Sequence, residues 1–276
     1  MRCMFKAVVA AFALNFSANL AMPATAQQSQ IEIFYEEPSN VELRPTYERL
    51  KRGAILEKLR EFLSPLRLPR KLTVRTAQCD APTRPYERGG PITVCYELMD
   101  KVARLVAEHS KDLNDQENFD EESLINAAFV ESTLHQTALA IFDILEVPIW
   151  GREFDAADRL AAFVMTQFGE DAMRTLILNT TRIFEWSDRT WTGQDFASTA
   201  SPQAQRFYNY LCTAYAGDPL GFSSLVPKTL PDWRAGQCER EYEQVKQAFN
   251  LRIMPFVDPD LLVKVKATQW LNRTPG

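Results

Sequence analysis

The stretch LINAAFVESTLHQTALAIFDIL, residues 124–145, constrains the fold most because it is apolar almost all round. A helix with that composition cannot lie on a surface with one face in water, so it has to be buried among other elements. Asp120 or Ser123 can cap its start, and the Val147 and Pro148 pair ends it. The sequence therefore predicts a central buried helix that the rest of the chain encloses.

Shorter elements flank this helix in the sequence. Apolar residues at helical spacing predict an amphipathic helix within residues 41–63. KLTVRT at residues 71–76 and PITVCYEL at residues 91–98 predict two strands, joined by the turn-rich APTRPYERGG. Further helices are expected up to about residue 108 and at residues 151–168, 170–186, 201–216 and 234–250. The predicted fold class is α+β, mostly helical, with a small β-sheet and a central buried helix.

The N-terminal segment resembles a secretion signal. Arg2 and Lys6 form a short basic start, an apolar run follows, and ATA at residues 24–26 has the small-x-small form that signal peptidase recognises. Residues 1–26 are therefore predicted to be a signal peptide that directs the protein to the periplasm or out of the cell. A membrane anchor is the weaker alternative, because the apolar run is short and polar residues interrupt it.

The mature chain is expected to begin near Gln27. Residues 27–40 are polar and are expected to form a flexible arm, and residues 41–276 a single domain. No later stretch is apolar and free of charge over the length that a membrane span needs. Loss of the two positive charges in the leader changes the formal net charge from −5 to −7. Such an acidic chain has no basic surface to attract nucleic acid or an anionic membrane.

Four cysteines remain after the leader is removed: Cys79, Cys95, Cys212 and Cys238. An even number of cysteines in a secreted chain predicts disulfides. Four cysteines allow three pairings, and we favour the pairing of sequence neighbours, 79 with 95 and 212 with 238. Each bond would stabilise the fold by about 3 kcal/mol. A cysteine metal site is the disfavoured alternative, because the sequence has no CxxC pair.

A zinc-peptidase motif is present in the central helix only in part. The His-Glu-x-x-His motif places two His one helical turn apart, so that both bind one ion, and the Glu accepts a proton from the bound water. The same positions here are His135, Gln136 and Leu139. A cluster of carboxylates follows in GREFDAAD, at the start of the next predicted helix.

Several segments, taken in order, resemble a family of secreted bacterial proteins described as "putative metallopeptidase". The resemblance covers about residues 33–250 and implies a zincin-like metallopeptidase scaffold. The matching segments are FYEEP at Phe34, LPR at Leu68, ITVCYEL at Ile92, VPIWGREFDAAD at Val147, QRFYNYLCTAYAGDP at Gln205 and RAGQCEREY at Arg234.

The resemblance also assigns positions of the family's zinc site. His135 is at the first zinc His, Gln136 at the catalytic Glu, and Leu139 at the second His. The third ligand of the family, a Glu, corresponds to Phe154, and the Asp that orients the first His corresponds to Asp158. A further family His is replaced near residue 200.

These replacements favour a protein that binds no zinc and has lost its catalytic residues. One imidazole cannot supply the three protein ligands of a catalytic zinc site, so no cofactor is expected. We expect His135 to be a buried core His bonded to a carboxylate such as Asp158, and the chain to act as a pseudo-peptidase that binds a protein or peptide. The alternative is an active metal-dependent peptidase with zinc and non-standard ligands around His135: Glu131, Glu153, Asp155 and Asp158.

Overall fold

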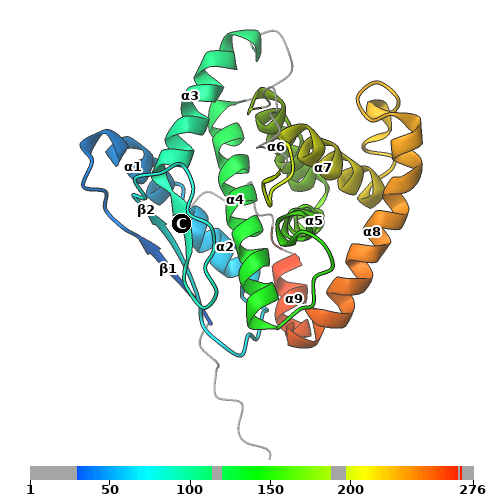
Figure 1. The fold of residues 1–276 in the computed structure, drawn as a ribbon, viewed down its shortest axis with the longest axis horizontal. Helices are drawn as coiled ribbons and strands as arrows, with labels where there is room; N and C mark the ends of the chain where they lie inside the picture. The colour runs from blue at the N-terminus through cyan, green and yellow to red at the C-terminus, as the bar shows by residue number, and fades with distance from the viewer. Residues whose placement is uncertain (1–29, 114–119, 188–196, 267, 269–276) are drawn as a thin grey trace, which may run out of the picture.

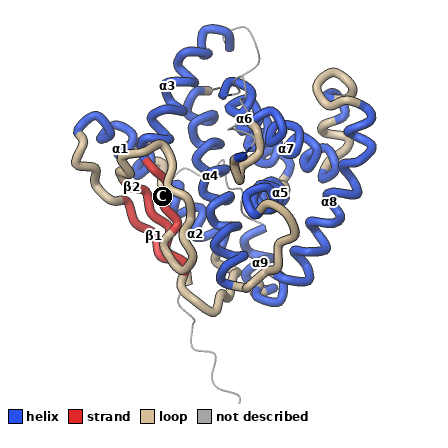
Figure 2. Tube along the Cα trace, in the orientation of Figure 1, coloured by secondary structure: helices blue, strands red, loops and turns tan. Residues whose placement is uncertain are grey.

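The fold is organised around one long helix. The computed structural model describes residues 30–113, 120–187, 197–266 and 268. Helix α4 (Glu121–Ile144) runs through the middle of the molecule, with a small sheet on one side and a group of helices on the other (Figure 1). Figure 2 shows the strands gathered in one small region, with helices making up most of the remainder. The mostly helical α+β class expected from the sequence is confirmed.

The sheet has three parallel strands in the order β1-β2-β3. They are β1 (Ile31–Tyr35), β2 (Leu72–Ala77) and β3 (Ile92–Cys95). All four residues of β3 are buried, and this strand packs against α4. The sheet therefore closes one side of the core around the central helix. A specifically zincin-like arrangement of these elements stays a prediction.

Two local features differ from the sequence prediction. Residues 31–35 form the edge strand β1, although residues 27–40 were expected to be a flexible arm. The strand IEIFY is itself mostly apolar, but it is short, and QQSQ before it and EEPSN after it make the segment polar as a whole. The single helix expected within residues 41–63 is divided by Ala54, whose φ of +48° interrupts helical geometry.

The divided segment lies between β1 and β2. It consists of a short 3-10 turn η1 (Val41–Leu43), helix α1 (Arg44–Arg52) and helix α2 (Ile55–Leu63). The buried side chains of α1 and α2 join the main hydrophobic core, and α2 also contacts β1 and α4. The break at Ala54 thus lets two short helices take different directions over the sheet.

Helix α4 is buried along most of its length, as its composition predicts. The Asp120 carboxylate caps it by accepting from the Glu122 backbone N–H at 2.8 Å, which satisfies one of the free donors at the helix start. Leu124, Phe129 and Ala140 are fully enclosed. The predicted central helix is therefore confirmed, with boundaries shifted by a few residues.

The other helices complete the domain. Those expected from the sequence are all present: α3 (Tyr96–Leu113), α5 (Glu153–Met165), α6 (Glu170–Ser187), α7 (Gln203–Gly217) and α8 (Asp232–Arg252). Helix α9 (Pro259–Lys266) follows the short turn η4 (Met254–Phe256), and η3 (Ser223–Leu225) lies before α8. Within the described ranges, no helix combines the length and apolarity that crossing a bilayer requires.

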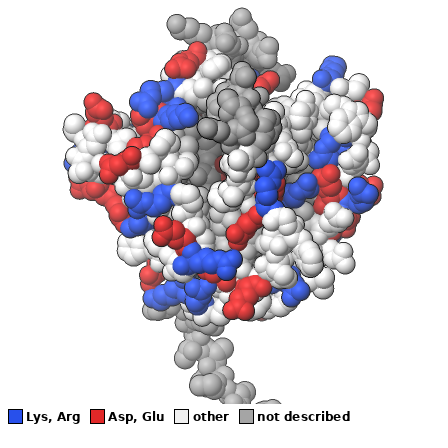
Figure 3. Space-filling model, viewed as in Figure 1, with Lys and Arg blue, Asp and Glu red and all other residues white. Residues whose placement is uncertain are grey.

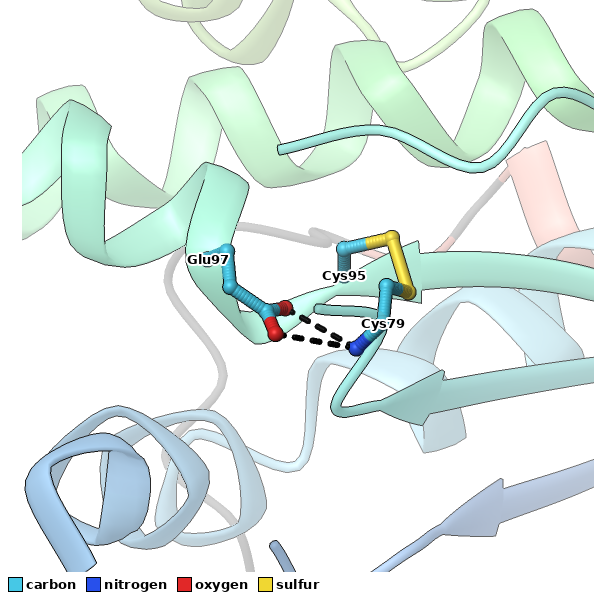
Figure 4. Close-up of side chains that lie close together, drawn as sticks. All are labelled: Cys79, Cys95 and Glu97. Atoms are coloured by element: carbon cyan, nitrogen blue, oxygen red, sulfur yellow. Dashed lines mark hydrogen bonds between the residues drawn. A yellow bond between two sulfur atoms is a disulfide. The ribbon is translucent and has the colours of Figure 1, made fainter. Parts of the chain in front are cut away.

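The two disulfides have the predicted pairing. Cys79–Cys95 joins the segment after β2 to the end of β3, and Cys212–Cys238 joins α7 to α8. Figure 4 shows Glu97, at the start of α3, turned toward the first bond, where it accepts from the Cys79 backbone N–H at 3.0 Å. The predicted signal peptide lies outside the described residues.

Candidate functional site

The candidate site lies where α4, α5 and α7 meet. Helix α4 supplies Glu131 and His135, one turn apart on one face, and α5 supplies Asp158. Helix α7 supplies Arg206 and Tyr210, again one turn apart. The first three side chains are 3–8% exposed. Three helices thus bring five polar side chains together in an interior that is otherwise mostly hydrocarbon.

His135 is held by Asp158. The His135 Nδ1 and Asp158 Oδ1 atoms are 2.7 Å apart, and both side chains are buried. A carboxylate at one ring nitrogen fixes the orientation of an imidazole and directs its other nitrogen, Nε2, away from the carboxylate. This is the contact that the sequence analysis expected for a buried core His.

Arg206 joins the two carboxylates. Its Nε donates to Asp158 Oδ2 at 2.7 Å, and its Nη2 donates to Asp158 Oδ1 at 2.7 Å and to Glu131 Oε1 at 2.6 Å. The guanidinium also lies 4.3 Å from the centre of the Phe184 ring, in a cation–π contact. Bidentate Arg–carboxylate pairing is geometrically specific, so Arg206 fixes the relative positions of α4, α5 and α7.

Tyr210 completes the cluster by donating from its hydroxyl to Glu131 Oε1 at 3.0 Å. Neither Arg206 nor Tyr210 was singled out by the sequence analysis. The only signal for them is their place in the QRFYNYLC segment, because their contacts depend on how α7 packs against α4 and α5. We refer to Glu131, His135, Asp158, Arg206 and Tyr210 as the ion cluster.

The charges of the ion cluster stabilise one another. Burial alone would raise the pKa of Asp158, but the Arg206 charge and hydrogen bonds from His135 and Arg206 outweigh it and hold that pKa well below its usual range. Burial would lower the pKa of Arg206, but Asp158 and Glu131 raise it well above normal. Burial, together with the Glu131 and Asp158 charges, raises the pKa of Tyr210. Asp158 and Arg206 are therefore a fully ionised pair at neutral pH.

The structure brings together only part of the predicted alternative ligand set. Ligand atoms of Glu131, His135 and Asp158 all lie within 4.8 Å of one another. Asp155 has other partners, since it accepts from Ser201 at 2.6 Å and pairs with Arg152 at 2.7 Å. Glu153 is likewise not part of this group among the described residues. One other such group, Cys79, Cys95 and Glu97, has its two sulfurs in a disulfide.

The opposite side of His135 is hydrocarbon. The Phe154 ring centre lies 5.4 Å from that of His135, and Leu139 is only 4% exposed. Gln136 is polar, and its buried Oε1 has no hydrogen-bond partner among the residues that the structure describes. Neither Leu139 nor Phe154 offers the lone pair of an imidazole or carboxylate to an ion at His135.

Residues 35–252 match a protein family described as "Putative metallopeptidase". The chain belongs to this family. The match extends from the end of β1 to the end of α8, and so contains the whole ion cluster together with Leu139 and Phe154. No curated protein and no solved structure matches the chain.

The residues of this family member do not fit a catalytic zinc ion. Such an ion needs three protein ligands and an open position for water. Of the positions that resemble the family's ligands, only His135 carries a donor, whereas Leu139 and Phe154 are hydrocarbon. Both oxygens of Asp158 accept from Arg206, and Oε1 of Glu131 accepts from Arg206 and Tyr210. No hydrolytic step through a metal can be derived from this donor set.

Proposed function

We propose that this member of the putative metallopeptidase family is a secreted pseudo-peptidase that binds a peptide or protein segment without cleaving it. One observation carries the proposal: the residues that orient His135 are intact, while the positions of the other zinc ligands are hydrocarbon. The protein would act in the periplasm or outside the cell, in keeping with two disulfides and the predicted leader.

The chemistry of three side chains supports the loss of hydrolysis. Leu139 and Phe154 have no lone pairs to offer a metal. Gln136 has nearly the shape of Glu, but an amide cannot take the proton of an attacking water. A peptidase of this type would thus lack both its ion and its general base.

The chemistry of the same side chains supports binding. The buried Oε1 of Gln136 has no partner, and an unpaired buried acceptor is costly, so a donor that reached it would bind favourably. A backbone N–H of an extended peptide is such a donor, and Phe154, which is partly exposed like Gln136, offers an apolar contact.

The alternative function is a metal-dependent peptidase that uses Glu131, His135 and Asp158. The convergence of their ligand atoms within 4.8 Å favours it. Metal analysis of protein purified without chelator separates the two proposals. We expect far less than one zinc per chain. About one zinc per chain, lost on His135→Ala, would establish the alternative.

A triple variant tests the assignment of the site. Gln136→Glu, Leu139→His and Phe154→Glu together would restore two His one turn apart, a general base, and a carboxylate from the next helix. The metal-free variant should lose roughly 2–5 kcal/mol of stability because polar groups enter an apolar region. Zinc should then raise its Tm by binding only the folded state, and leave that of the wild type unchanged.

The control for this test carries the same three changes plus His135→Ala. It should gain no thermal stability from zinc, because it lacks the ligand that Asp158 orients. If the folded triple variant takes up no zinc, these positions do not converge on one ion, and the assignment of the site is wrong.

Peptide binding is tested with Gln136→Met, which keeps the length of the side chain and removes the acceptor. The probe is a fluorescein-labelled peptide selected from a random library against the mature chain. We expect Gln136→Met to weaken its binding about tenfold, the effect of one lost hydrogen bond in a buried site. Gln244→Met, at an exposed position of α8, is the control. Equal affinities of the two variants would reject the proposed role of Gln136.

A further inference from the structure

A cavity lies along α4, apart from the ion cluster. It encloses about 340 Å³ between α2, α4, α5, α8 and α9. Helix α4 contributes Leu134, Ala138 and Ile141 to its wall. None of the five residues of the ion cluster lines it. The volume is at the lower end of the range for small-molecule sites, so it suits one slender ligand.

The wall of this cavity is mainly hydrocarbon. Phe62, Leu160, Phe163 and Phe249 enclose it from three helices. The hydroxyl of Thr137, one of its few polar groups, already donates to the Thr133 carbonyl at 2.7 Å. The wall therefore offers a ligand few free hydrogen-bonding groups and favours an aliphatic ligand.

Among the described residues, the charged ones that line the cavity are two lysines, Lys246 on α8 and Lys266 on α9. Both are exposed, and Lys246 also pairs with Glu243. Lys266 takes part in none of the ion pairs of the described residues, and its Nζ lies 3.4 Å from Gln167 Oε1. No Asp or Glu of the part of the chain that the structure describes lines the cavity. By contrast, Figure 3 shows acidic and basic side chains interspersed over the face that it draws.

We propose that this cavity binds a long-chain aliphatic carboxylate. The hydrocarbon chain lies in the apolar interior, and the carboxylate lies at the rim, where it pairs with Lys266 and Lys246. Lysine suits this arrangement because its flexible stem lies along apolar surface while its ammonium stays in water. The charge of the rim selects the head of the ligand, and the wall selects its tail.

Chain length provides a first test. Each methylene buried in an apolar site strengthens binding by about fourfold. The probe is cis-parinaric acid, a slender polyene carboxylate whose fluorescence rises on entering an apolar site, and the competitors are saturated carboxylates from octanoate to hexadecanoate. We expect displacement to strengthen with length until the cavity is full. Absence of saturable probe binding to the mature chain would overturn the proposal.

The head group is tested with two competitors and a matched pair of variants. Hexadecanoate should displace the probe at least tenfold better than hexadecan-1-ol, which has no charge for the lysines. Lys266→Glu should weaken hexadecanoate binding by about tenfold or more, whereas Lys264→Glu, exposed on the same helix but outside the cavity wall, should not. Equal effects of the two variants would overturn the assignment of the rim.

The interior is tested with Ala138→Phe, which places a ring inside the cavity. Circular dichroism and a cooperative thermal unfolding transition establish that the variant is folded. It should abolish probe binding, while the exposed change Lys266→Glu tests the same site without altering the core. Binding of phospholipid vesicles in place of the free carboxylate, or full binding by Ala138→Phe, would contradict the proposal.

Discussion

The side chains around His135 are charged on one side of the imidazole and mainly apolar on the other. On one side, Asp158, Glu131 and Arg206 form a closed set of ion pairs in which each charge has a partner. On the other side, Leu139 and Phe154 are hydrocarbon, and the buried oxygen of Gln136 is unpaired. We call these the paired side and the apolar side.

Under the proposed function, the contrast explains how a metal site could lose its ligands and keep the residues that orient His135. If Asp158 relied on a metal-bound imidazole for compensation, the loss of the metal would leave a buried charge unpaired, at high cost. Arg206 compensates Asp158 and Glu131 independently of any ion. Replacing ligands by Leu139 and Phe154 therefore leaves the paired side intact.

The largest expected effect comes from removing the cation of the paired side. Arg206→Met leaves Glu131 and Asp158 buried without a counterion, so the free energy of unfolding should fall by about 3–5 kcal/mol. Urea denaturation measures it. Arg104→Met, which breaks an exposed pair with Asp100, should cost no more than about 1 kcal/mol. Similar losses in the two variants would remove the distinction between the two sides.

The next effect tests the apolar side as packed core. Leu139 is buried, so Leu139→Ala should lower the free energy of unfolding by about 2–5 kcal/mol through lost transfer energy and a residual cavity. Leu139→Met conserves volume and should cost less than about 1.5 kcal/mol. If Leu139→Ala proved neutral, the Leu139 side chain would not contribute to the packed core.

The third effect depends on pH. Asp158→Asn should cost about 1.5–3 kcal/mol at pH 7, where it removes charged hydrogen bonds. The pKa of Asp158 is lower in the folded chain than its unfolded value of about 3.9, so this stabilisation is present above that pH and lost below it. Denaturation at several pH values should show that the difference in the free energy of unfolding between Asp158→Asn and wild type becomes smaller below about pH 4. A constant difference would mean that the Asp158 charge contributes nothing.

The smallest effect should have the opposite sign. Gln136→Met removes an unpaired buried acceptor, so stability should stay equal or rise, by up to about 1 kcal/mol. Tyr210→Phe is the counterpart on the paired side, where it removes the bond to Glu131 and should destabilise by about 1 kcal/mol. The Tm of each variant relative to wild type measures the two effects. A lower Tm in both variants would show that the Gln136 side chain is hydrogen-bonded in solution.

The elements that could be predicted from sequence are those with strong local signals. Helix α4 is apolar all round and has an Asp cap, so its place and extent followed from composition. Strand β1 was missed because its five residues lie between polar segments, so that residues 27–40 are polar as a whole. The break at Ala54 was missed because a left-handed alanine has no signature in the sequence.

Only those parts of the candidate site could be predicted that follow from helical periodicity or from the family resemblance. His135 and Asp158 were paired correctly because their positions resemble those of the family's first His and its orienting Asp. Arg206 was missed because it lies 48 residues beyond Asp158, and local sequence patterns do not report contacts at that separation. Asp155 was expected as an alternative ligand, but the structure pairs it with Ser201 and Arg152.

The disulfide between Cys212 and Cys238 has a consequence for how the interior becomes exposed to water. It ties α7, which carries Arg206, to α8. Local opening that separates Arg206 from the carboxylates has to move both helices, because neither can leave without the other. Amide hydrogens of α7 and α8 would then exchange with solvent as one cooperative unit, and reduction of the bond would divide that unit in two. One covalent link thus sets how much of the chain must unfold before the buried charges meet water.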